Sequence, residues 1–191
     1  MTFIPGDDNY RLSGTRYLTH AALIAAVYAA LTILLAPISF GQQQLRVAEA
    51  LAIMPAFTPA AIPGLFVGCL IANTVSFYGV PDLIFGSLAT LLSAWLAYII
   101  ARFTRERGAL LQAALIPLPA VCVNTVVIGV MIAVLSGVPV QVSMLGVLIG
   151  QLLSCYGLGA PLFLALRGYS RYARARRQDS RQDNRQDSRQ D

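Results

Sequence analysis

The longest uncharged stretch of the chain limits its fold more than any other feature. Residues 108–166 contain no Asp, Glu, Lys or Arg, and 57% of the chain is hydrophobic, with a mean hydropathy of +0.65. Soluble domains carry about 25% charged residues, whereas this chain carries 12%. Helices satisfy their backbone hydrogen bonds without water. The sequence therefore predicts an all-α, polytopic membrane protein.

Four uncharged runs set the expected number of membrane spans. A span takes about 20 apolar residues, so the runs 17–45 and 83–101 each predict one helix. The run 108–166 predicts two helices, with a turn at residues 136–139, which read Ser-Gly-Val-Pro. The run 50–81 is too long for a single helix and is interrupted by prolines.

Arginine positions decide between one and two spans in the run 50–81. Arginines cluster before the first run, after the run 83–101 and after the last run, and the positive-inside rule places all three clusters in the cytoplasm. An even number of crossings must then separate the first two clusters. We expect six helices with both termini cytoplasmic, at approximately 18–38, 47–57, 60–76, 83–101, 110–135 and 140–166.

These spans divide the chain into three parts. Residues 1–17 form a cytoplasmic segment that we expect to be retained, because no signal-peptide cleavage site follows it. Residues 18–167 form the transmembrane domain, and residues 168–191 combine a basic juxtamembrane stretch with a tail of RQDS-type repeats. Charges cancel within the tail, and its four-residue period would stack like charges on a helix, so we expect disorder there. The net charge of +5 follows topology and does not indicate nucleic-acid binding.

Polar side chains inside the predicted spans gather in the outer half of the membrane. Such residues are costly in lipid, so each is a functional hypothesis. Arg46 and Glu49 lie three residues apart on one face of the second span. The others are Asn73, Asn124 and Gln151. Together they predict a polar pocket between helices that opens outward, with the loop 40–44 at its mouth.

Each of these residues also has a structural interpretation. Arg46 and Glu49 would form an interfacial ion pair, and a single Asn or Gln in a span would make one interhelical hydrogen bond of about 1 kcal/mol. Asp82 precedes an apolar helix, which favours a helix cap over a ligand contact. The three cysteines lie in apolar segments without metal-ligand spacing, so we expect reduced packing residues.

The chain lacks the residues that common enzymes, metal sites and ATPases require. All 14 basic residues are arginine, so no Walker lysine is present, and there is a single histidine. No His-Glu-x-x-His motif and no Ser-His-Asp set occurs. We therefore expect no catalysis, no metal and no cofactor, and any work driven by ATP would require another subunit.

Small residues form a stripe on the first predicted span. Ala22, Ala26 and Ala30 recur at intervals of four, beside a second row of alanines, and such a face lets another helix approach closely in lipid. It is the candidate docking surface for a partner protein. Two Gly-xxx-Gly pairs, beginning at Gly64 and Gly146, are expected to pack inside the bundle.

Three long segments resemble the QueT family. They read APISFGQQQLRVAEALAIMPAFTPAAIPGLFVGCLIAN at 36–73, DLIFGSLATLLSAWLAY from Asp82, and GQLLSCYGLGAPLFLAL at 150–166. The resemblance covers residues 18–167. QueT proteins are the substrate-binding (S) components of energy-coupling factor transporters that are assigned to queuosine precursors. The resemblance implies a six-helix cell-membrane protein that captures its ligand from outside and works with a coupling transmembrane protein and two cytoplasmic ATPase subunits.

The resemblance also implies a 7-deazaguanine ligand. The N1–H and exocyclic amine of such a base are adjacent donors that one carboxylate accepts together, and Glu49 is the carboxylate expected to do so. Five further residues are expected either to donate to the O6 side or to complete the hydrogen-bond network, namely Gln44, Arg46, Asn73, Asn124 and Gln151. Phe40 and Tyr78 are expected to stack on the ring.

The family pattern has a glutamate where this chain has Gln151. With one negative charge fewer, a neutral nitrile-bearing precursor or free queuine fits better than a cationic aminomethyl precursor. Two alternatives stay open. One is an S component for another vitamin-like molecule, because a fold does not define its ligand. The other is a membrane assembly protein that transports nothing and uses the first span to bind a partner.

Overall fold

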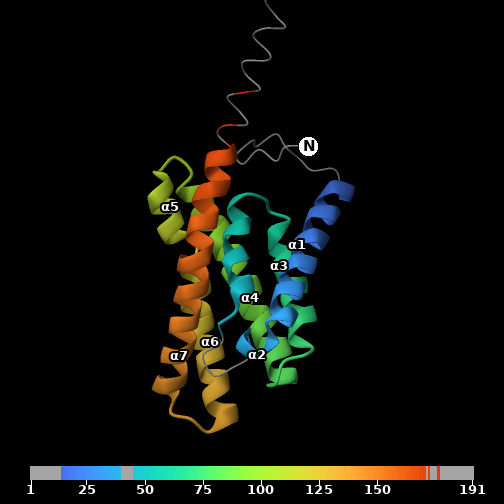
Figure 1. The fold of residues 1–191 in the computed structure, drawn as a ribbon, viewed down its shortest axis with the longest axis vertical. Helices are drawn as coiled ribbons and strands as arrows, with labels where there is room; N and C mark the ends of the chain where they lie inside the picture. The colour runs from blue at the N-terminus through green and yellow to red at the C-terminus, as the bar shows by residue number, and fades with distance from the viewer. Residues whose placement is uncertain (1–13, 40–44, 171, 173–175, 177–191) are drawn as a thin grey trace, which may run out of the picture.

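The computed structural model describes residues 14–39, 45–170, 172 and 176, and every regular element in these ranges is a helix (Figure 1). The expectation of an all-α protein is confirmed. The elements in chain order are α1 (Gly14–Leu34), α2 (Ala36–Ser39), the 3-10 helix η1 (Val47–Ala56), α3 (Ala61–Asn73), the π-helical η2 (Asp82–Gly86), α4 (Ser87–Phe103), α5 (Ala109–Leu115), α6 (Leu118–Ser136), α7 (Val140–Leu152) and the π-helical η3 (Leu153–Gly159).

Four helical stretches in the described part of the chain are long and apolar enough to cross a membrane. They are Gly14–Leu34, Asp82–Phe103, Ala109–Ser136 and Val140–Ser170. Two shorter apolar helices, η1 and α3, lie between the first and second of these in the chain. A multi-pass membrane protein is therefore supported, while the two additional spans needed for six crossings remain a prediction.

The predicted helix positions are close to the observed ones, and the differences occur where the backbone changes geometry. The second predicted helix, 47–57, corresponds to η1, which contains Pro55 and forms a 3-10 helix. The helix predicted over 110–135 is divided by a bend at residues 116–117, between α5 and α6. Pro117 and Pro119 have no amide hydrogen to donate, which accounts for the interruption.

Helices α1 and α3 are in direct backbone contact at two glycines. A Cβ atom added to Gly64 would lie 2.7 Å from the carbonyl oxygen of Ala21, and one added to Gly68 would lie 2.8 Å from that of Ala25. The expectation that this glycine pair packs internally is confirmed. The same contact buries one alanine row of α1 and leaves the other row exposed, namely Ala22, Ala26 and Ala30.

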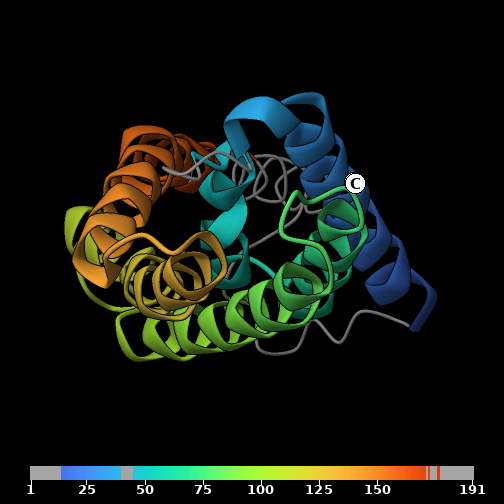
Figure 2. The same ribbon diagram turned by 90° about the horizontal axis from the view of Figure 1, so that it is seen from below.

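The short helix η1 occupies the centre of the bundle. It packs against α1, α3, α4 and η3, so that the longer helices surround it (Figure 2). In its second half Ile53 joins Ile116 and Phe163 in an apolar cluster, and at its start Ala48 joins Tyr28 and Leu65 in another. Residues at the start of η1 are consequently surrounded by protein.

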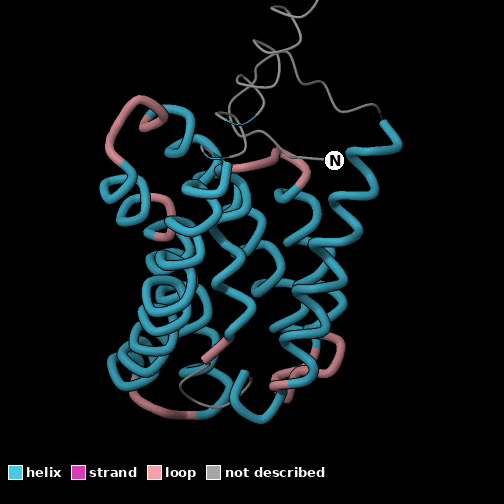
Figure 3. The backbone as a smooth tube through the Cα atoms, turned by 45° about the horizontal axis from the view of Figure 1, so that its top comes forward, coloured by secondary structure: helices cyan, strands magenta, loops and turns pink. Residues whose placement is uncertain are grey.

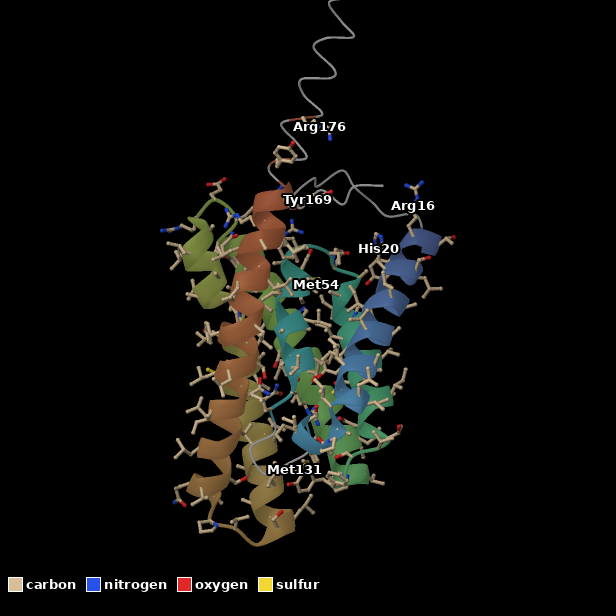
Figure 4. All side chains as sticks on the ribbon, viewed as in Figure 1. Arg16, His20, Met54, Met131, Tyr169 and Arg176 are labelled. Carbon is tan, nitrogen blue, oxygen red and sulfur yellow. The ribbon has the colours of Figure 1, made fainter. Side chains whose placement is uncertain are left out.

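Most loops lie at the two ends of the bundle (Figure 3). Arg16 near the start of α1 lies at the same end as Tyr169 and Arg176, whereas Met131 lies at the opposite end (Figure 4). The N-terminal end of the first helix and the C-terminal end of the last helix therefore lie on the same side of the bundle. An even number of crossings requires this arrangement.

Replacing Gly68 with alanine is expected to weaken the α1–α3 contact, because the new methyl group would overlap the backbone of Ala25. Overpacking of this kind costs about 1–3 kcal/mol, and a lower midpoint of thermal unfolding in detergent would report it. Gly157→Ala is the matched control, since a Cβ atom there meets nothing within 4 Å. Equal midpoints for the two variants would contradict the proposed contact.

Candidate functional site

A buried ion pair connects the start of η1 to the start of η2. Arg46 directly precedes η1, and its Nη2 atom lies 2.9 Å from Oδ2 and 3.2 Å from Oδ1 of Asp82. The side chains are 3% and 0% exposed, respectively. Removing two charges from water is favourable only when further hydrogen bonds satisfy their remaining polar atoms. The end of α3 and the turn after it supply those bonds.

Asn73 bridges both members of the ion pair. Its Oδ1 atom accepts a hydrogen bond from Nη2 of Arg46 at 3.0 Å, and its Nδ2 atom donates to the backbone oxygen of Asp82 at 2.8 Å. Ser76 donates its hydroxyl to Oδ2 of Asp82 at 2.5 Å. Cys69 accepts from Asn73 and, at 3.8 Å, from Arg46. We call these five residues the Arg46 cluster.

Gly86 leaves room for the Arg46 cluster. A Cβ atom at this position would lie 2.6 Å from Oδ1 of Asp82 and 2.7 Å from Nδ2 of Asn73. The glycine ends η2, and single π-helical turns of this kind are frequent at functional sites. The close approach of the two side chains to the helix backbone therefore depends on the absence of a side chain at Gly86.

Glu49 lies on η1 and faces a different set of polar groups. Tyr28 of α1 donates its hydroxyl to Oε1 of Glu49 at 2.7 Å, and both side chains are buried. The side-chain amide of Asn124 on α6 approaches the same carboxyl group. The salt bridge of Arg46 is made with Asp82, and Arg46 acts on Glu49 as a neighbouring charge, so the interpretation of Arg46 and Glu49 as a simple interfacial ion pair does not describe this buried arrangement. The interpretation of Asp82 as a helix cap is also wrong, since its carboxylate accepts from Arg46 and Ser76.

Cys155 of η3 connects Gln151 to η1. Its thiol lies 3.6 Å from the backbone oxygen of Glu49 and 3.6 Å from Oε1 of Gln151. Gln151 is 2% exposed and Asn124 is 3% exposed. Within the described residues, hydrogen bonding of the Gln151 side chain is through its oxygen, which leaves the two amide hydrogens as donors for another molecule. We call Tyr28, Glu49, Asn124, Gln151 and Cys155 the Glu49 cluster.

The structure brings five of the predicted binding residues together in the interior, from η1, α3, α6 and α7. They are Arg46, Glu49, Asn73, Asn124 and Gln151. The half-buried Tyr78 packs against the apolar cluster of α6 and α7 that contains Ile128 and Val147, and its backbone amide donates to the hydroxyl of Ser76 at 3.2 Å. Phe40 and Gln44 lie outside the described residues.

Tyr28 and Asp82 are the principal contributors that sequence reasoning missed. Tyr28 follows Ala21 and Ala25 on the buried face of α1, at the spacing of seven and three residues that marks one side of a helix. A phenol hydroxyl on that largely apolar face, which also carries Thr32, is a signal that could have identified it. Asp82 was noticed in the sequence but interpreted as a helix cap, because its partner Arg46 is distant in the sequence and comes close only in the folded bundle.

Breaking the Arg46–Asp82 pair is expected to destabilise the protein strongly. Asp82→Asn leaves the guanidinium buried without its anion, at a cost of about 3–5 kcal/mol, whereas replacing both partners, as Arg46→Met with Asp82→Leu, should recover much of that loss. Thermal unfolding in detergent would measure both effects. Glu106→Gln, at an exposed loop carboxylate, is the control. An Asp82→Asn midpoint equal to that of the control would refute the assignment.

Comparison with known proteins identifies the family of this chain. The family model described as QueT transporter matches residues 18–168. The queuosine precursor transporter QueT of Lactococcus lactis subsp. cremoris (strain MG1363) is 39% identical over 82 residues, which cover 42% of this chain and 48% of that protein. The match thus spans about half the length of that relative. No solved structure matches significantly. Because the family model covers most of the sequence, this chain belongs to the QueT transporter family.

Proposed function

We propose that this protein is the membrane substrate-binding (S) component of an energy-coupling factor importer, and that it captures a 7-deazaguanine precursor of queuosine from outside the cell. Membership of a transporter family implies a non-enzymatic role, and the relative from Lactococcus lactis is named for transport of a queuosine precursor. The single observation that carries the choice of ligand is the buried Glu49 carboxyl group, whose neighbouring guanidinium is engaged by Asp82.

Charge and hydrogen bonding both favour a ligand that donates to Glu49. The two clusters contain one guanidinium and two carboxyl groups, and the salt bridge engages the carboxyl group of Asp82. A buried carboxylate is costly unless donors surround it. Tyr28 supplies one donor, and the N1–H and exocyclic amine of a guanine-type base would supply two more in a charge-assisted arrangement.

The other polar residues divide into two roles. Asn124 and Gln151 present amide groups near Glu49, so we assign them to the O6 side of the base. Both polar atoms of Asn73 are engaged within the Arg46 cluster, and we assign Arg46 and Asn73 to holding the helices around the ligand. The donor role of Gln44 and the stacking roles of Phe40 and Tyr78 stay predictions.

Calorimetric titration of the purified protein in detergent tests this assignment. We expect tight binding of queuine or of one of the 7-cyano and 7-aminomethyl deazaguanines, at about one molecule per chain. Glu49→Gln should weaken binding about 10- to 100-fold, because hydrogen bonds to a charged group contribute about 1.5–3 kcal/mol.

Glu106→Gln, which removes an exposed carboxylate, should bind like the unmodified protein. If folded protein binds none of the three compounds, the queuosine assignment fails. If Glu49→Gln binds as tightly as the unmodified protein, the ligand lies elsewhere.

We further propose that the exposed row Ala22, Ala26 and Ala30 docks on the coupling transmembrane protein, with two cytoplasmic ATPase subunits supplying the energy. These alanines are exposed along one side of α1, and small residues permit close helix contact in lipid. The absence of lysine from the sequence leaves no Walker A motif in this chain.

We propose six crossings with both termini cytoplasmic, counting η1 and α3 with the four long helices. The end that carries Arg16 and Arg176 would then face the cytoplasm, in keeping with the positive-inside rule (Figure 4). In a Cys122→Ala background, a membrane-impermeant thiol reagent applied to intact cells should label Ser136→Cys and spare Glu106→Cys. The opposite labelling pattern would invert the proposed topology.

A further inference from the structure

Helix α1 lies at the edge of the bundle (Figure 2). Its main neighbours are α3 and η1. The contact with α3 is made by backbone and small side chains at Gly64 and Gly68. The contact with η1 includes the hydrogen bond from Tyr28 to Glu49, which connects α1 to the rest of the Glu49 cluster.

Tyr28 is held firmly in α1. Its side chain is 1% exposed, and its Cβ atom would be 2.9 Å from a Cβ atom placed on Gly68. Thr32, one turn further along, donates its hydroxyl to the backbone oxygen of Tyr28 at 2.9 Å. The ring consequently has little room to move by itself, and a displacement of its hydroxyl would be transmitted to the helix.

We propose that Tyr28 is a positioning residue that couples ligand occupancy at Glu49 to the placement of α1. This inference rests on the proposed function. A ligand that donates to the Glu49 carboxylate competes with Tyr28 for the orientation of that group, so the loaded and empty sites favour different positions of the Tyr28 hydroxyl. Since the ring is packed against α3, the helix moves with it, and the exposed row Ala22, Ala26 and Ala30 moves as part of the same helix.

Coupling between two sites is a free-energy difference that both sites share. A partner that docks on one position of the alanine row would therefore bind the loaded protein with a different affinity from the empty protein. The hydrogen bond of Tyr28 supplies a physical link for that difference, and its removal should separate ligand binding from the movement of α1.

Distances between spin labels test this proposal in lipid nanodiscs. Labels are attached to Ala26→Cys on α1 and Leu145→Cys on α7, both exposed positions, in a Cys122→Ala background. Pulsed electron paramagnetic resonance is recorded with and without the deazaguanine that binds best in calorimetry. We expect the ligand to shift the mean distance by about 1–2 Å, the size of typical helix displacements in switching proteins.

Tyr28→Phe removes one donor from Glu49 and should weaken ligand binding by up to about tenfold. Measured at saturating ligand, this variant should lose the distance shift, which a purely structural role would not predict. Thr32→Val is the matched control, because Thr32 is buried in the same helix and its hydroxyl donates to the backbone of Tyr28 rather than to Glu49. This control should keep the shift.

Each outcome of the distance measurement bears on a separate claim. A full ligand-induced shift in Tyr28→Phe overturns the role of Tyr28, while the proposed function stands. The role of Tyr28 is also overturned if the ligand binds to the labelled protein that retains Tyr28 and the distance does not change. This measurement does not require the Tyr28→Phe variant to fold. Failure of the unmodified protein to bind any deazaguanine overturns the proposed function itself.

Discussion

The buried ion pair between Arg46 and Asp82 is the interaction on which the interior of this protein depends. Two full charges within a bundle of apolar helices are stable only when their geometry and remaining hydrogen bonds are satisfied. Asn73, Ser76 and Cys69 provide these bonds from the end of α3 and the following turn. The pair thereby brings the starts of η1 and η2 against α3, three segments that are separate in the chain.

This pairing also decides which groups surround the carboxyl group of Glu49. If Arg46 were paired with Glu49, the region would offer little to a ligand, because its charge would be compensated internally. With Asp82 as the salt-bridge partner of Arg46, Glu49 keeps the guanidinium as a neighbouring charge and has the Tyr28 hydroxyl and the Asn124 amide as hydrogen-bonding neighbours. One buried ion pair therefore separates a structural cluster from a group that is suited to recognising adjacent donors.

Irregular helix geometry accompanies both clusters. The central η1 is a 3-10 helix that contains Pro55. The two π-helical segments, η2 and η3, contain Asp82 and Cys155, respectively. A 3-10 helix rises about 2.0 Å per residue, against about 1.5 Å for an α-helix. A short proline-containing segment can thus extend further through the bundle than an α-helix of equal length, with its polar residues placed between the longer helices.

The sequence by itself determined the helical class and the approximate helix positions, because hydropathy and proline positions are local properties. It also determined that Gly64 and Gly68 pack inward. Since polar groups are costly in lipid, it further determined the burial of four polar residues, namely Glu49, Asn73, Asn124 and Gln151. The resemblance to the QueT family was likewise recognisable from the sequence. Only the tertiary structure decided that Arg46 pairs with Asp82 and that Tyr28 reaches Glu49. These partners lie in different segments of the chain, and the local pattern of a single sequence does not reveal which helix faces pack together.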